Sequence, residues 1–299
     1  MAVEVRVRAM GTLAHIVVVG AGQDALARAR RRLVDLEHLW SRFSPSSEIT
    51  RLNESAGRAV TVSAPTRALV RLGVAGWRST GGRFDPTVLH ALELVGYDRD
   101  FDEISAEGAP FVASPAPGCA GIEIDEGAGT VHLPAGVEFD PGGIAKGYAA
   151  DLIAGELIEV GARGACVNVG GDLRVFGEAP DDDGWIVGVE HPFEGEAQRL
   201  RITEGAVATS TRVRRSWVRG GIRRHHLIDP TAGEPSTSGL ASATVVTTLG
   251  WRAEVLAKAA FLSGVQSAPK VLTDAGATGF VVDDAGVVHH APGIEAVLV

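Results

Sequence analysis

The feature that most constrains this chain is a glycine-rich stretch, residues 140–151, with the sequence Asp-Pro-Gly-Gly-Ile-Ala-Lys-Gly-Tyr-Ala-Ala-Asp. The short run 137–139 before it predicts a strand, and apolar residues at helical spacing after it predict a helix. Glycines let a backbone approach a ligand closely, and the N–H groups of a first helical turn lack partners within the helix. With the positive charge of Lys146, the stretch predicts an anion site that suits a phosphate.

The stretch does not identify the phosphate. Gly147 follows Lys146 where a P-loop has Ser or Thr, and the glycines do not fall in the G-x-G-x-x-G spacing of dinucleotide-binding folds. A strand-to-helix turn that binds no ligand is the alternative, because such turns are common in α/β proteins.

Charge narrows the class of ligand. The 299 residues include 28 Lys and Arg against 37 Asp and Glu, a net charge of −9, which argues against a nucleic-acid binder. Lysine occurs only at positions 146, 258 and 270, so each lysine stands out against an arginine background. Cys119 and Cys166 are too few for a disulfide framework and have no zinc-site spacing, so reduced thiols are expected.

The N-terminal residues alternate apolar and charged side chains, as a half-buried strand does, and lack the pattern of a signal peptide. No apolar run is long enough to span a bilayer. We therefore expect a cytoplasmic protein with no membrane segment.

Strand and helix signals alternate along the chain. Residues 3–19 predict two strands joined by a tight bend at 10–12, and a polar loop is expected at 41–53. Apolar spacing predicts helices over 24–40, 65–77 and 251–262. The Gly-, Pro- and Ala-rich segment 98–118 predicts a long connection and the expected seam between two lobes. These patterns alone indicate mixed α and β structure.

Two further features carry charge. His226 lies beside an Asp-Pro turn and an arginine-rich segment, where an imidazole acts either as a general base or as a structural side chain. Glu254 and Lys258 are four residues apart on the predicted last helix, the spacing of an ordinary helical salt bridge.

Seven motifs that are individually weak occur in a fixed order along nearly the whole chain. They are Met10-Gly11-Thr12; Ser41-Arg42-Phe43 with Ser47-Glu48-Ile49 and Arg51-Leu52-Asn53; Phe84-Asp85-Pro86-Thr87; Gly142-Gly143-Ile144-Ala145-Lys146-Gly147-Tyr148; Asn168-Val169-Gly170-Gly171-Asp172; Ala208-Thr209-Ser210; and His226-Leu227-Ile228-Asp229-Pro230. Together they closely resemble the ApbE family of FAD:protein FMN transferases.

The resemblance implies a fold and an activity. Members have an α+β, two-lobed, T-fold-like architecture with antiparallel sheets, packed helices and an FAD cleft between the lobes. Transferases of the family move FMN from FAD to a Thr or Ser hydroxyl of a target protein and release AMP. We therefore expect residues 1–299 to form a single ApbE-like domain with a soft seam near 98–118, FAD as a ligand and an unidentified Ser/Thr-containing acceptor protein.

The resemblance also implies roles for individual residues. Lys146 and the 142–147 backbone would neutralise the pyrophosphate, His226 would be the base, and Phe43 would stack on the flavin. The other positions expected near the cofactor are Met10, Gly11, Asn53, Asp85, Gly142, Gly143, Asp151, Gly170, Gly171, Asp172, Thr209 and Ser210.

One departure from the family concerns Mg²⁺. The family usually carries Ala-Asp-x-Leu-Ala-Thr in its last helix, where the Asp and Thr, with main-chain oxygens near the Ala of the glycine turn, hold the metal. Ala145 and Glu254 match two of these positions, but Lys258 stands where the Thr ligand is expected, and a protonated lysine cannot bind a cation.

Two alternatives follow. Either the Lys258 ammonium supplies the positive charge itself, or it pairs with Glu254 and leaves a metal-free pocket that binds FAD without transfer. The sequence thus predicts an FMN transferase, with an FAD-binding carrier or an FAD pyrophosphatase that yields FMN and AMP as alternatives.

Overall fold

Antiparallel sheets and packed helices make up the computed structural model, which describes residues 1–105, 111–181 and 183–299. The contact pattern divides the chain into two units. Unit 1 comprises Met1–Leu36, Lys146–Thr211 and Ser238–Val299, and unit 2 comprises Glu37–Ala145 and Arg212–Thr237. The α+β class predicted from the sequence is confirmed.

Unit 1 is built on an antiparallel sheet whose strand order is β1-β2-β6-β7-β10-β15-β16-β17. Its strands are β1 (Ala2–Ala9), β2 (Thr12–Val19), β6 (Gly164–Val169), β7 (Asp172–Gly177), β10 (Gly205–Thr211), β15 (Leu240–Thr247), β16 (Thr278–Asp283) and β17 (Val288–His290). The bend between β1 and β2 is the predicted one. Met10 and Gly11 have φ of 54° and 64°, the positive values that a two-residue hairpin loop requires.

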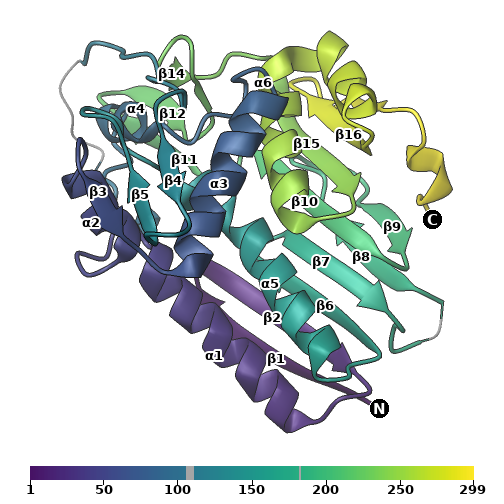
Figure 1. Cartoon of the computed structure of the whole chain (residues 1–299). Helices are drawn as coiled ribbons and strands as arrows, with labels where there is room; N and C mark the ends of the chain where they lie inside the picture. The colour runs from purple at the N-terminus through teal and green to yellow at the C-terminus, as the bar shows by residue number, and fades with distance from the viewer. Residues whose placement is uncertain (106–110, 182) are drawn as a thin grey trace. The chain divides into compact units, whose positions relative to one another are not determined.

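Three helices lie on one face of this sheet in Figure 1, namely α1 (Gln23–Trp40), α5 (Ala145–Glu159) and α6 (Gly250–Asp274). Arg32 on α1 forms an ion pair with Glu156 on α5. The opposite face packs against the hairpin of β8 (Trp185–Val189) and β9 (Gln198–Ile202), through a buried cluster that includes Val175, Trp185 and Leu200. A short 3-10 helix, η3 (Ile294–Ala296), adds Ile294 to that cluster.

Helix α6 extends beyond the predicted 251–262. Gly264 adopts φ 76° and ψ 170°, which kinks the element, and the helix resumes with Pro269 inside its second part. Among the described residues, no helix is both long and apolar enough to cross a membrane.

Unit 2 contains a three-stranded antiparallel sheet in the order β3-β5-β4 and two hairpins. Its strands are β3 (Ala59–Thr61), β4 (Glu123–Asp125), β5 (Thr130–His132), β11 (Ser216–Arg219), β12 (Ile222–His225), β13 (Ile228–Asp229) and β14 (Glu234–Pro235). Its helical elements are α2 (Glu48–Glu54), α3 (Ala64–Ser79), α4 (Leu89–Leu94), η1 (Phe101–Glu103) and η2 (Pro141–Gly143). A buried cluster of Leu92, Val95, Tyr97 and Trp217 joins α4 to β11.

Two local predictions are wrong. Residues 137–139 form no strand, because the backbone N–H and C=O of Phe139 bond to the side chain of Asn53 instead of a neighbouring strand. The polar loop 41–53 contains α2, whose N-terminus is capped by Ser47. Residues 98–105 and 111–118, where the seam is expected, belong to unit 2, and residues 106–110 lie outside the described residues. The contact pattern divides the chain after Leu36, Ala145, Thr211 and Thr237. The sheet of unit 1 draws strands from three separate segments, so no single connection can separate the units.

Candidate functional site

The N-termini of α5 and α6 meet in unit 1. A Cβ atom on Gly147 would lie 2.5 Å from the carbonyl carbon of Gly250, and one on Gly250 would lie 3.0 Å from the carbonyl carbon of Gly147. Distances this short leave room only for glycine at both positions. The glycine that follows Lys146 in the sequence therefore allows two helix ends to touch.

Each helix end receives a carboxylate from the other helix. Asp151 on α5 accepts hydrogen bonds from the backbone N–H groups of Gly250 (2.7 Å) and Trp251 (3.0 Å). Glu254 on α6 accepts one from the backbone N–H of Gly147 at 2.9 Å. The anion predicted for the start of α5 is thus, at this N–H, a side chain of the protein itself.

Four charged side chains surround this junction, and we call Lys146, Asp172, Glu254 and Lys258 the charge cluster. The Lys146 ammonium forms ion pairs with Asp172 and with Glu254 Oε1, the latter at 2.6 Å. Lys258 Nζ lies 3.4 Å from the same Oε1, as the helical spacing predicted. The Glu254 side chain is only 2% exposed and that of Asp172 7%. By formal charge the cluster therefore pairs two lysines with two carboxylates, and these side chains are largely withdrawn from water.

The environment shifts the pKa values of these groups and of Asp151. Burial raises the pKa of Glu254, but the lysines Lys146 and Lys258 outweigh it and hold the pKa below its usual value. Burial opposes the charge on Lys146, yet Asp172 and Glu254 raise its pKa above the ordinary range. Burial lowers the pKa of Lys258. Burial also raises the pKa of Asp151 to about 6, although the N–H groups of α6 work against this shift.

The predicted Gly170-Gly171 pair forms the turn between β6 and β7, with φ of 67° and 101°. Asn168 accepts a hydrogen bond from the Gly171 N–H at 2.8 Å and so closes the turn. Asp172 follows immediately, at the start of β7. The turn thus places the Asp172 carboxylate against Lys146.

Two predicted hydroxyl residues lie on β10. Thr209 forms a hydrogen bond with Thr244 on β15 at 3.0 Å, and Ser210 is buried. Met10 and Gly11 form the β1–β2 bend.

In unit 2, Asn53 donates to the carbonyl of Phe139 (3.1 Å) and accepts from its N–H (2.8 Å), which fixes the chain just before the glycine-rich turn. Asp85 accepts from the N–H (2.8 Å) and the hydroxyl (2.6 Å) of Thr87, and burial raises its pKa. The predicted Gly142 and Gly143 lie in η2, and Ala145 begins α5. Asn53 and Asp85 thus hold backbone in place.

Phe43 lies on the surface of unit 2 with 36% of its area exposed. The Arg42 guanidinium lies 4.2 Å from the centre of the Phe43 ring and 4.6 Å from that of Tyr97, the distances of cation–π contacts. Arg42 also donates to the carbonyl of Tyr97 and forms an ion pair with Asp140 at 3.3 Å. The predicted aromatic is therefore exposed and held by a fixed neighbour.

The two adjacent histidines differ. His225 is buried; its Nε2 contacts the carbonyl of Ser236 at 3.1 Å, and its Nδ1 accepts from the N–H of Leu227. His226 is half-buried, and its Nδ1 lies 3.4 Å from the carbonyl of Arg215. When Nδ1–H donates to that carbonyl, Nε2 is the basic nitrogen of the neutral ring.

The predicted site residues fall on both units. Within unit 1, Lys146, Asp172 and Glu254 come into direct contact, and Asp151 caps the adjoining helix. Phe43, Asn53, Asp85 and His226 belong to unit 2.

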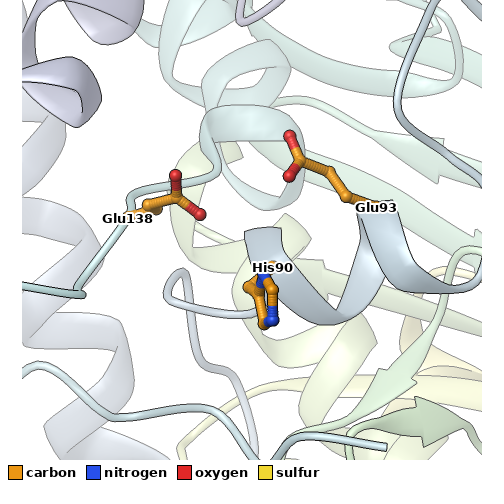
Figure 2. Close-up of side chains that lie close together, drawn as sticks. All are labelled: His90, Glu93 and Glu138. Atoms are coloured by element: carbon orange, nitrogen blue, oxygen red, sulfur yellow. The ribbon is translucent and has the colours of Figure 1, made fainter. Parts of the chain in front are cut away.

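Sequence reasoning missed one grouping in unit 2. His90 and Glu93 lie one turn apart on α4, and their ligand atoms and those of Glu138 lie within 4.8 Å of one another. Figure 2 shows the carboxylates of Glu93 and Glu138 pointing toward each other. Burial and then the Glu138 charge raise the pKa of Glu93. The His-x-x-Glu spacing was the available signal, and the imidazole of His90 is exposed.

Comparison with known proteins agrees with the motif order. The sequence model of the ApbE family matches residues 10–282. The chain is 28% identical over 290 residues to an FAD:protein FMN transferase of Rhodobacter capsulatus, covering 94% of this chain and 55% of that protein. It is 31% identical over 210 residues to one from Klebsiella pneumoniae (strain 342), covering 68% and 64%. The chain thus spans less than two thirds of either relative's length.

Solved structures have the same fold. The ApbE protein from Thermotoga maritima superposes with a TM-score of 0.88 at 27% identity over 99% of each chain. The flavin transferase ApbE from Vibrio cholerae gives a TM-score of 0.83 at 22% identity over 100% of this chain and 99% of that one, a similarity of fold. With the family model matching most of its length and the ordered motifs in place, the chain belongs to the ApbE family.

Proposed function

We propose that this chain is an FAD:protein FMN transferase, which moves FMN from FAD to a Thr or Ser hydroxyl of a target protein and releases AMP. The observation that carries the proposal is the match over residues 10–282 to a family whose relatives bear that name. The exposed Phe43 and half-buried His226 are compatible with contact to a dinucleotide substrate.

The reaction makes one bond and breaks another. The acceptor hydroxyl oxygen attacks the phosphorus of the FMN phosphate, the bond between that phosphorus and the bridging oxygen breaks, and the AMP phosphate leaves with the bridging oxygen. The hydroxyl proton needs a base, and Nε2 of His226 takes it while the Arg215 carbonyl holds Nδ1–H and fixes the tautomer. Orientation of the two phosphates supplies much of the remaining rate.

Lys146 and the 142–147 backbone are the proposed partners of the pyrophosphate. The ion pairs with Asp172 and Glu254 hold the Lys146 ammonium in one position, and preorganised charge stabilises a transition state without a reorganisation cost. Phe43 would stack on the flavin ring, with Arg42 already fixing the position of the phenyl side chain.

We further propose that residues 1–299 act as one functional domain, that the protein works in the cytoplasm, and that its acceptor is a cytoplasmic Ser/Thr-containing protein. The negative net charge of −9 supports a protein rather than a nucleic acid as the acceptor.

The test is to incubate the purified protein with FAD and a Ser/Thr-containing acceptor peptide, measuring AMP by chromatography and peptide mass by mass spectrometry. A peptide carrying FMN together with AMP is the expected result, and His226→Ala should abolish both while its thermal unfolding midpoint stays near that of the wild type. AMP with free FMN alone, in the presence and absence of peptide, would identify an FAD pyrophosphatase. FAD binding without AMP would identify a carrier.

A further inference from the structure

Both carboxylate oxygens of Glu254 already contact hydrogen-bond donors of the protein. Oε2 accepts the backbone N–H of Gly147 at 2.9 Å, and Oε1 contacts Lys146 at 2.6 Å and Lys258 at 3.4 Å. A Mg²⁺ ion demands close oxygen ligands in near-octahedral geometry and would have to displace these donors. The donor set around Glu254 therefore does not fit the Mg²⁺ that the family resemblance implies.

The net charge of the charge cluster also disfavours a divalent cation. Without Lys258 the charge cluster would hold one ammonium against two carboxylates, a net charge of −1 in a largely buried place. Lys258 brings the cluster to neutrality. A divalent cation added to the four residues would leave a net charge of +2, which burial makes unfavourable. With a neutral residue at position 258 the same cation would leave a net charge of only +1, so lysine at this position disfavours a divalent cation by one further buried charge.

Lys258 lies beside the carboxylate in a largely enclosed place. Its side chain is 17% exposed, and its Nζ lies 3.4 Å from Oε1 of Glu254, one turn earlier on α6. The ammonium therefore contacts the carboxylate oxygen that a metal ion would otherwise use.

We propose that Lys258 replaces a divalent metal ion at Glu254, so that this chain binds its dinucleotide substrate without Mg²⁺. The part of the proposal that concerns the substrate rests on the proposed function. The part that concerns the metal depends only on the charge cluster and is tested with the protein alone.

The first experiment titrates Mg²⁺, and Mn²⁺ as a paramagnetic probe, into wild type, Lys258→Thr and Lys270→Thr in the absence of FAD. Lys270 is the matched control because it pairs with Asp274 at the same four-residue spacing on α6 but is exposed. We expect no binding at the charge cluster in wild type or Lys270→Thr, and at least about a tenfold gain in metal affinity in Lys258→Thr. The double variant Glu254→Asp with Lys258→Thr restores the family's residues and should gain as much.

The second experiment measures FAD affinity with Mg²⁺ and with a chelator. The FAD dissociation constant of wild type should be the same within about twofold in both buffers, whereas that of Lys258→Thr should fall when Mg²⁺ is added. Stoichiometric Mn²⁺ binding by wild type that Glu254→Gln removes would overturn the proposal, as would the lack of any gain in metal affinity in both variants that carry Lys258→Thr. If no variant binds FAD, the proposed function fails, while the metal titration still decides the role of Lys258.

Discussion

Gly147 and Gly155 lie on the same helix, and the structure predicts opposite effects when each is changed to alanine. A Cβ on Gly147 would lie 2.5 Å from the carbonyl carbon of Gly250 and 2.9 Å from the backbone nitrogen of Trp251. Both are backbone atoms of α6, so no side chain can turn away and the two helix ends must separate. Separation also weakens the hydrogen bond from the Gly147 N–H to Glu254.

The magnitude follows from these two effects. Overpacking against a rigid neighbour costs about 1–3 kcal/mol, and a strained hydrogen bond to a charged group costs about 1.5 kcal/mol more. Gly147→Ala should therefore lower the free energy of unfolding by about 3 kcal/mol, or the thermal midpoint by roughly 5 °C. A Cβ on Gly155 would have no neighbour within 4 Å, so Gly155→Ala should instead raise stability by about 0.5–1 kcal/mol.

Urea unfolding followed by circular dichroism measures both variants, with the midpoints compared at equal slope. The pair controls for helix propensity, because both variants replace glycine with alanine within α5. A Gly147→Ala protein as stable as wild type would refute the close contact between the two helix ends. Equal destabilisation by Gly155→Ala would show that the effect is not specific to the junction.

Three further predictions concern single side chains. Burial raises the folded-state pKa of Asp151 to about 6, so protonation of its carboxyl stabilises the fold fully below about pH 4, and this contribution is lost as pH rises through 6. The free energy of unfolding of Asp151→Asn relative to wild type should therefore rise by up to about 3 kcal/mol between pH 4 and 7.5, measured by urea unfolding at each pH. A difference that does not change with pH would contradict the pKa shift. Asn53→Ala loses both hydrogen bonds to Phe139 and should destabilise by about 2 kcal/mol in the same assay, whereas a change under 0.5 kcal/mol would contradict the role of Asn53 in holding that segment. Glu138→Gln removes a like charge near Glu93, so it should lower the Glu93 pKa in an NMR titration and stabilise the protein by about 0.5 kcal/mol at pH 7; an unchanged Glu93 titration would refute the coupling.

Local rules predicted the elements that depend on neighbouring residues. The Met10-Gly11 bend, the helix 24–40 and the Gly170-Gly171 turn all follow from backbone preferences or apolar spacing within a few residues, and the structure has all three. The Glu254–Lys258 pair was predicted for the same reason, since four residues form one helical turn.

Contacts between residues far apart in the sequence could not be predicted from local sequence patterns. The partner that holds Glu254 most closely is Lys146, 108 residues away, and no periodicity connects the two. Residues 137–139 have the composition of a strand, but hydrogen bonds to Asn53, 86 residues earlier, replace the strand pairing. His90, Glu93 and Glu138 come together for the same kind of reason. In each case tertiary contacts decide the local structure and override the local propensity of the sequence.

The contact between α5 and α6 accounts for the sequence on both helices. Two helix N-termini, each carrying partial positive charge, repel one another when they touch, and a hydrogen-bond acceptor at each end offsets that repulsion. Asp151 stands four residues after Gly147 and Glu254 four residues after Gly250, and each carboxylate accepts N–H groups of the other helix.

The two carboxylates then differ in their cations. The Arg174 guanidinium lies 3.8 Å from Asp151, whereas two lysines contact Glu254. The pKa of Glu254 is accordingly below its usual value, and that of Asp151 is above it. Glu254 already accepts the Gly147 N–H of α5 and pairs with Lys146. A further cation that balances its charge must therefore fit beside these contacts. The Lys258 ammonium, one turn along the same helix, does so without displacing them.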